Sequence, residues 1–156
     1  MPLIFLKSKA PFSPALQQSL GKLWEQCPPR VRAANLYLRQ VPREEWEHGR
    51  FTGWSNNGSI ELKAGEWTKT AGLGMHEMLH YVYQAIMTPV QREEWAAWSA
   101  KHAALLPTDY ARKGGPDEAM AESAVAVYRK PLPKGYRKAG AELEKNVRHF
   151  AEGAPL

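Results

Sequence analysis

The most chemically informative pattern in this chain is a pair of histidines four residues apart, with a glutamate directly after the first. It consists of His76, Glu77 and His80, within GMHEMLHYVY at 74–83. On a helix, residues i and i+4 lie on one face, so both imidazoles can direct a nitrogen at a single point. Glu77 projects about a quarter-turn away, where its carboxylate can reach a metal-bound water as a general base must. The pattern therefore predicts a metal site with its own base.

A catalytic zinc ion normally takes three protein ligands and leaves one position open for water. Cys27 is the only cysteine, so a thiolate cluster and an intramolecular disulfide are both excluded, and the ligands must be histidine and carboxylate. Downstream, DEAMAES carries Glu118 and Glu122 one helical turn apart among alanines, whose small side chains let a helix pack closely. Such a pair taken alone is more typical of a solvated acidic face. The other candidate third ligand is His102.

Hydrophobic periodicity predicts the elements that must position these residues. Helices are expected over five segments, at about 14–27, 70–87, 89–105, 116–129 and 136–151. Alternation predicts a strand over 34–41, and Asn57-Gly58 predicts a hairpin over 50–65. Residues 107–115 have the composition of a loop. The expected fold class is α+β, with a small mixed sheet packed on the active-site helix, a glutamate helix downstream, and a single domain covering 1–156.

Two glycines, Gly72 and Gly74, lie near the start of the helix that carries the histidines. Each costs about 1 kcal/mol relative to alanine in a helix interior. Either another segment approaches closely there or the helix begins after them, and the sequence leaves both possibilities open. On the same helix, Leu73, Leu79, Val82 and Ile86 are expected to supply core packing.

Length and charge exclude several classes of protein. The chain has 156 residues, the size of one ordinary domain, and a net charge of +5 from 21 basic and 16 acidic residues. Because the cations are mixed with acids, we expect a mildly basic solvated surface rather than a nucleic-acid-binding stripe. Apolar stretches fall far short of the ~20 residues of a membrane helix, and lysines and prolines interrupt the opening segment before a signal-peptide core could form. A cytoplasmic protein without a membrane partner is expected.

The residues from HEMLH to DYARKGGPDEAMAES resemble the gluzincin metallopeptidases, and most specifically the catalytic domain of the anthrax lethal factor type. In that family a tyrosine in a Y-A loop precedes an E-x-x-A-E helix. The resemblance spans about residues 50–129 and implies a zincin-like fold. It also implies zinc-dependent hydrolysis of a peptide or protein substrate.

The resemblance carries roles onto individual positions of this chain. It implies that His76, His80 and Glu118 bind one zinc ion, that Glu77 is the general base, and that Tyr110 stabilises the transition state. Glu122 would accept a hydrogen bond from the far nitrogen of a ligand histidine. The large partner-binding and substrate-docking regions of lethal factor are missing, so the chain is closer to compact gluzincins and no toxin role follows.

Alternative functions remain open at this stage. HEMLHYVY also resembles the SprT-like peptidases that act on DNA-bound proteins, whose third ligand is a histidine. That role would fall to His102, which lies in a predicted helix rather than in a downstream loop, so Glu118 is preferred. A regulatory peptidase that cuts one specific partner, and a non-catalytic binding module that keeps the metal site, are further possibilities. The intact Glu77 argues against the last, because a module without activity needs no base.

Substrate alignment also leads to an expectation. Zincin-like sheets present an edge strand to an extended substrate, and main-chain pairing along such a strand is largely indifferent to side chains. The best candidate for this edge is GSIELKAG, at 58–65.

Overall fold

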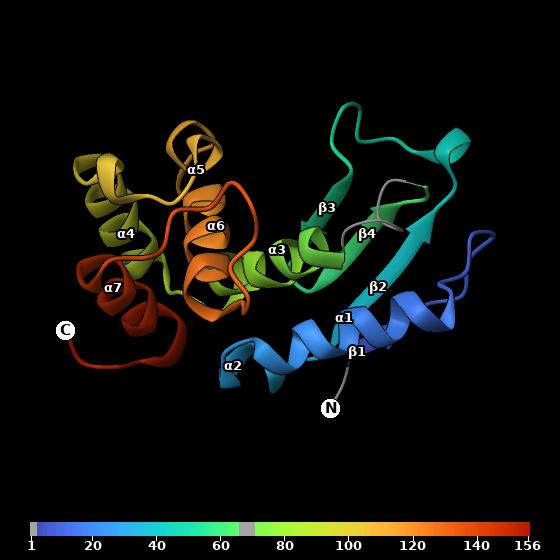
Figure 1. The fold of residues 1–156 in the computed structure, drawn as a ribbon, viewed down its shortest axis with the longest axis horizontal. Coiled ribbons are helices and arrows are strands. Elements are labelled where there is room, and N and C mark those ends of the chain that lie inside the picture. Colours follow the sequence, from blue (N-terminus) through green and yellow to red (C-terminus); the bar gives the residue numbers. More distant parts are fainter. Residues whose placement is uncertain (1–2, 66–70) are drawn as a thin grey trace.

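Four short strands form one mixed sheet in the computed structural model, which describes residues 3–65 and 71–156 (Figure 1). They are β1 (Leu3–Phe5), β2 (Leu36–Val41), β3 (Gly53–Asn56) and β4 (Ser59–Lys63). The strand order is β1-β2-β4-β3; β2 runs parallel to both β1 and β4, whereas β3 and β4 are antiparallel. The α+β class and the small mixed sheet are confirmed, but β1 was not predicted.

Alternation and turn chemistry explain the central part of the sheet. Along β2, Leu36 and Leu38 are buried while Tyr37 is exposed, because successive side chains of a strand point to opposite faces. Asn57 and Gly58 join β3 to β4 with φ values of 47° and 92°. These are the left-handed conformations that a two-residue hairpin turn requires, so the predicted strand and hairpin are both confirmed.

Helices pack against the sheet and make up the rest of the molecule. They are α1 (Pro14–Gln26), α2 (Pro29–Arg32), α3 (Ala71–Tyr81), α4 (Pro89–Lys101), α5 (Asp109–Lys113), α6 (Pro116–Tyr128) and α7 (Ala141–Glu152). A π-helix, η2 (Val82–Ile86), continues α3, and short 3-10 turns occur at Arg43–Glu45 and Ala103–Leu105. In Figure 1, α1 runs along the sheet, and α3 leads from the sheet to the group formed by α4, α5, α6 and α7.

The five predicted helices are present in outline. Residue 70, the first residue of the predicted second helix, lies outside the described residues. The predictions differ from the structure at α2, at the start of the last helix and at residues 109–113. The short helix α2 was not predicted, and the last helix begins at Ala141 rather than near 136. Residues 109–113 were expected in a loop but form α5, because the Thr108 hydroxyl caps the helix by accepting a hydrogen bond from the main-chain N–H of Ala111 at 3.0 Å.

At Gly74, near the start of α3, another segment of the chain does approach closely. A Cβ atom there would collide with the Leu20 side chain of α1, so glycine lets these two helices approach closely. Leu79 and Val82 are fully buried in the core, as expected. Leu73 was wrongly assigned to the core: its side chain is 42% exposed.

The predicted edge strand is wrong. β4 lies between β2 and β3, so its main-chain groups are engaged on both sides, and among the described residues the unpaired edge beside α3 belongs to β3. A hairpin alone does not reveal which of its two strands also pairs with a third strand.

Within the described residues, no helix combines the length and the apolar character needed to cross a bilayer.

Candidate metal centre

The two histidines of α3 converge on one point. His76 and His80 are almost completely buried, and their Nε2 atoms lie 3.0 Å apart, as two imidazoles one helical turn apart on the same face can do. Glu77 is also buried and lies beside them. The helix therefore presents this part of the predicted site as the sequence indicated.

Glu118 reaches the histidines from the first turn of α6. Its Oε2 atom lies 3.0 Å from the His76 Nε2 atom and 3.3 Å from the His80 Nε2 atom. Two glycines make this position possible: a Cβ on Gly114 would lie 2.8 Å from the Glu118 side chain, and Gly115 has a φ of 89° directly before the helix. His76, His80 and Glu118 together form a cluster that could hold a metal ion.

The spacing of the three ligand atoms can be compared with a known coordination geometry. Two ligands at 2.0–2.1 Å from a tetrahedral zinc ion lie roughly 3.3 Å from each other. The three separations in the cluster are 3.0, 3.0 and 3.3 Å. The Glu118 Oε2 atom is buried and has no hydrogen bond of good geometry to any described residue. A buried oxygen without such a partner, facing two imidazole nitrogens, fits a bound cation.

Each histidine of the cluster has a carboxylate near its other ring nitrogen. The Nδ1 atom of His80 is hydrogen-bonded to the Asp117 carboxylate at 2.6 Å, whereas the Nδ1 atom of His76 lies 2.7 Å from the Glu122 carboxylate without hydrogen-bond geometry. Such contacts fix the orientation of the ring and leave Nε2 free to bind a metal. Glu122 lies beside the far nitrogen of His76, and the hydrogen bond that the resemblance implies between them stays a prediction. Asp117 was not among the predicted site residues, although its position directly before Glu118 was a signal that could have revealed it.

Glu122 is held in turn by residues outside the recognised motifs. The Thr108 hydroxyl donates to it at 2.6 Å, and the Tyr136 hydroxyl donates to its other oxygen at 2.5 Å. Tyr136 comes from the segment that follows α6, and sequence spacing gave no indication of this contact. These two donors keep the Glu122 carboxylate directed at the ligand ring.

Gln84, in the π-helix η2, connects the candidate metal cluster to the sheet. Its amide nitrogen donates to the Asp117 carboxylate at 3.0 Å and to the main-chain oxygen of Ser55 at 3.2 Å, while its amide oxygen accepts from the Asn57 N–H at 2.9 Å. π-Helical turns occur frequently at functional sites. Here the turn places one side chain between β3 and the carboxylate that orients His80.

Electrostatics in the cluster favour positive charge at its centre. Burial alone would lower the pKa of both histidines, but their contacts with Asp117, Glu118 and Glu122 outweigh burial and raise the pKa of the pair. Burial likewise acts to raise the pKa of Glu118, and the two histidines outweigh it, so this pKa falls well below its usual range. A divalent cation would supply the positive charge that protons supply in its absence.

Glu77 and Tyr110 face a groove beside the cluster. Recesses of about 260 and about 470 Å3 share four lining residues, namely Phe51, Gly53, Glu77 and Tyr110. Burial raises the pKa of Glu77, whose carboxylate is hydrogen-bonded to Ser55. The carboxylate therefore has the environment of a group that takes up and releases protons nearer neutral pH than an exposed glutamate.

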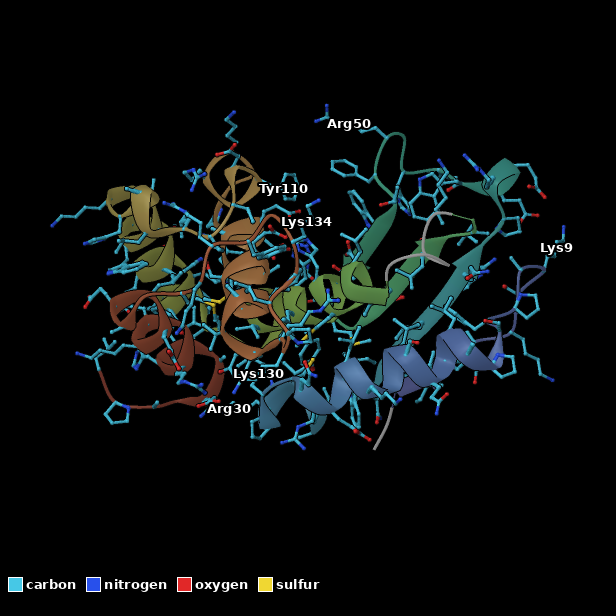
Figure 2. All side chains as sticks on the ribbon, in the orientation of Figure 1. Lys9, Arg30, Arg50, Tyr110, Lys130 and Lys134 are labelled. Carbon is cyan, nitrogen blue, oxygen red and sulfur yellow. The ribbon has the colours of Figure 1, made fainter. Side chains whose placement is uncertain are left out.

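Tyr110 lies on α5, on the side that faces β3 (Figure 2). Its ring centroid is 6.2 Å from that of His76, and its side chain is 44% exposed. Burial and the neighbouring Glu118 raise the pKa of Tyr110 to about 12, so its hydroxyl keeps its proton and can donate it in a hydrogen bond. The structure thus brings together all six residues that the resemblance selected.

His102, the alternative ligand, belongs to no group of potential metal ligands among the described residues. Its Nδ1 atom lies 2.8 Å from the Trp98 main-chain oxygen, and its ring stacks on the Trp98 indole. The third ligand of the SprT-like alternative is therefore absent from this cluster.

Leu73, expected in the core, instead lines the larger recess next to His76.

Comparison of the chain with protein-family models, with curated proteins and with solved structures finds no match. The interpretation of the site therefore depends on its own geometry.

Proposed function

We propose that this chain is a zinc-dependent metallopeptidase of the gluzincin type with a zincin-like fold. One observation carries the proposal: the ligand atoms of His76, His80 and Glu118 gather beside a groove that also contains Glu77 and a free strand edge. Two histidines and a carboxylate suit zinc, which prefers nitrogen and oxygen donors in a tetrahedral arrangement. A bound zinc ion would lower the pKa of its water to about 7 and polarise the scissile carbonyl.

The residues of the chain supply the remaining parts of hydrolysis. Glu77 takes the proton from the attacking water and delivers it to the leaving amine, a role that suits a buried carboxylate with a raised pKa. Tyr110 donates its hydroxyl to the oxyanion that develops at the scissile carbonyl. Asp117 and Glu122 hold the two imidazoles in place throughout.

The metal content of the purified protein tests the first part of the proposal. Protein prepared without chelator should carry about one equivalent of zinc by elemental analysis. Removing it should lower the melting temperature, because a ligand at about 100 times its Kd stabilises the folded state by about 2.7 kcal/mol. Zinc affinity should also fall as the pH is lowered, since protons compete for the same nitrogens. Substoichiometric zinc with no thermal shift on zinc addition would refute the metal site.

Cleavage of a mixed peptide library, followed by mass spectrometry, tests the second part. Turnover should disappear on chelation and return with zinc. A protein that binds one zinc ion tightly and cuts no peptide or candidate protein substrate would instead be a non-catalytic module.

Tyr110→Phe removes only the hydroxyl group and conserves the ring. We expect the turnover number to fall by about 100-fold, because one donor to a developing oxyanion contributes about 3 kcal/mol. Zinc content and melting temperature should stay nearly unchanged, since the side chain is half exposed on α5. Steady-state kinetics on a cleaved library peptide would measure the effect. Wild-type turnover in this variant would make Tyr110 a structural residue only.

Gly53 is the best position at which to test substrate pairing with the edge strand. The Lys63 N–H donates to the Thr52 oxygen at 2.9 Å, which makes Thr52 and Lys63 a hydrogen-bonded pair of the β3–β4 ladder. Because hydrogen-bonded and non-hydrogen-bonded pairs alternate in an antiparallel ladder, the main-chain groups of Gly53 point away from β4. Gly53 also lines both recesses, so its N–H and C=O are available to an extended peptide.

Gly53→Pro deletes this N–H without removing a bond of the ladder, and proline is tolerated on an edge strand in that orientation. We expect kcat/KM to fall about tenfold, the value of one lost hydrogen bond of about 1.4 kcal/mol, with no change in zinc content. Gly53→Ala is the matched control, since it keeps the N–H. An equal loss of kcat/KM in both variants would show that the added side chain crowds the groove. A folded Gly53→Pro enzyme with wild-type kcat/KM would show that the substrate does not pair with β3 at Gly53.

A further inference from the structure

The connection between α6 and α7 is unusually basic. Residues 129–138, RKPLPKGYRK, contain five lysines and arginines and no acidic residue. We call this segment the basic strap; it is the orange trace that leaves α6 toward α7 in Figure 1, and Figure 2 labels Lys130 and Lys134 on it. The even mixture of charges seen along the chain as a whole therefore does not apply here.

The basic strap is held in a fixed shape although it forms no regular secondary structure. At its start, the Gln26 side chain accepts from the Lys130 N–H at 3.0 Å and donates to the Lys130 oxygen at 3.1 Å. Further along, Tyr136 is anchored on Glu122. The Arg137 guanidinium donates to two main-chain oxygens in the segment before α5, at 2.8 and 2.9 Å. The other lysines and arginines of the basic strap therefore extend from a backbone whose position is fixed.

Cations of the strap surround a recess of about 370 Å3 against α7. Arg129, Lys130 and Lys138 line it together with Arg148 of α7, and Glu144 is the only acidic residue among the described residues of the lining. Arg148 is already paired with Glu144 at 3.0 Å. The other three form no ion pair with any residue in the described ranges 3–65 and 71–156. Like charges gathered in this way destabilise the folded state by mutual repulsion unless a partner compensates them.

We propose that the basic strap is a binding surface for the phosphate backbone of a nucleic acid. Arginine and lysine together are the usual donors to phosphate oxygens. The other lining residues are aliphatic, including Val127 and Leu132, so the recess has no aromatic ring on which a base could stack. Binding through phosphates alone is independent of base sequence. The surface uses none of the metal ligands, so this inference stands apart from the proposed peptidase activity.

Fluorescence anisotropy of a labelled random-sequence DNA, single-stranded and duplex, tests the proposal with the full chain. We expect a Kd of about 10⁻⁶ to 10⁻⁴ M at physiological salt, with log K falling linearly against log salt at a slope of about −2 to −3 between about 50 and about 200 mM. The double variant Lys130→Gln/Lys138→Gln should weaken binding about tenfold and reduce the slope by about two. Its zinc content should match wild type, and its melting temperature should be equal to or higher than that of wild type, because two mutually repelling cations are removed.

The control is Lys7→Gln/Lys9→Gln, which changes the net charge equally in the segment that follows β1; Figure 2 labels Lys9 at one end of the molecule, away from Lys130 and Lys134. It should bind like wild type. Equal weakening by both double variants would show a response to net charge alone and overturn the assignment. So would the absence of salt-dependent binding. A polyglutamate peptide that displaces the DNA at equal residue concentration would also overturn it, by assigning the strap to acidic proteins.

Discussion

Glu77→Gln should retain zinc and lose turnover by about 10²- to 10⁴-fold, the range contributed by a positioned general base. The amide keeps the size of the carboxylate but cannot take a proton from water. Because Glu77 lies beside the ligand cluster and outside it, the metal should stay bound at wild-type stoichiometry. Single-turnover kinetics on a library peptide, with elemental analysis of the same sample, would measure both quantities.

The outcomes of this experiment separate three roles. An equally active Glu77→Gln enzyme would remove Glu77 from the mechanism. Loss of zinc would make Glu77 itself a ligand. Glu93→Gln, an exposed glutamate of α4, is the matched control for the loss of one negative charge and should change neither quantity.

Removal of the third ligand should have the other large effect. Glu118→Ala leaves only His76 and His80, so we expect the purified variant to carry almost no zinc and to show no detectable turnover. A competition titration with a chromophoric chelator would give the affinity. His102→Ala should keep wild-type affinity, because that side chain is engaged with Trp98. Zinc loss in His102→Ala but not in Glu118→Ala would favour the SprT-like arrangement.

The carboxylates behind the histidines should show an intermediate effect in the same titration. Asp117→Asn and Glu122→Gln each remove one charge from the far side of a ligand imidazole, which typically costs about 10- to 100-fold in metal affinity. If either change stripped the metal as completely as Glu118→Ala, that residue would be a direct ligand. Unchanged affinity in both would show that the rings are oriented by packing alone.

Some parts of the site could be predicted because they depend on neighbours within one or two helical turns. The facing pair His76 and His80 follows from helical geometry, and the β3–β4 hairpin follows from the left-handed preference of Asn57 and Gly58. The residues offered Glu118 and Glu122 as candidate third ligands, and the choice of Glu118 came from the resemblance. Its physical basis, the space left by Gly114, became visible only with the helices in place.

Other parts depend on contacts between segments far apart in the chain. The hairpin pattern could not show that β2 pairs with β4, which makes β3 the free edge and moves the expected substrate strand by one position in the sheet. Tyr110 was expected in a loop because residues 107–115 have the composition of one. The Thr108 cap and the packing of α5 on α6 give it a helical frame instead.

The sequence by itself determined the chemistry available to this protein: two imidazoles one turn apart, a base between them, carboxylates downstream and a single cysteine. These are properties of residue type and local spacing. The tertiary structure decided which of those groups meet. It placed Asp117 behind His80, Tyr136 behind Glu122 and Gln84 between the sheet and the metal centre, and it left the cations of the basic strap without carboxylate partners among the described residues. The physical reason is that these contacts join separate elements, and their geometry exists only once the shared core has fixed how α3, α6 and the sheet pack together.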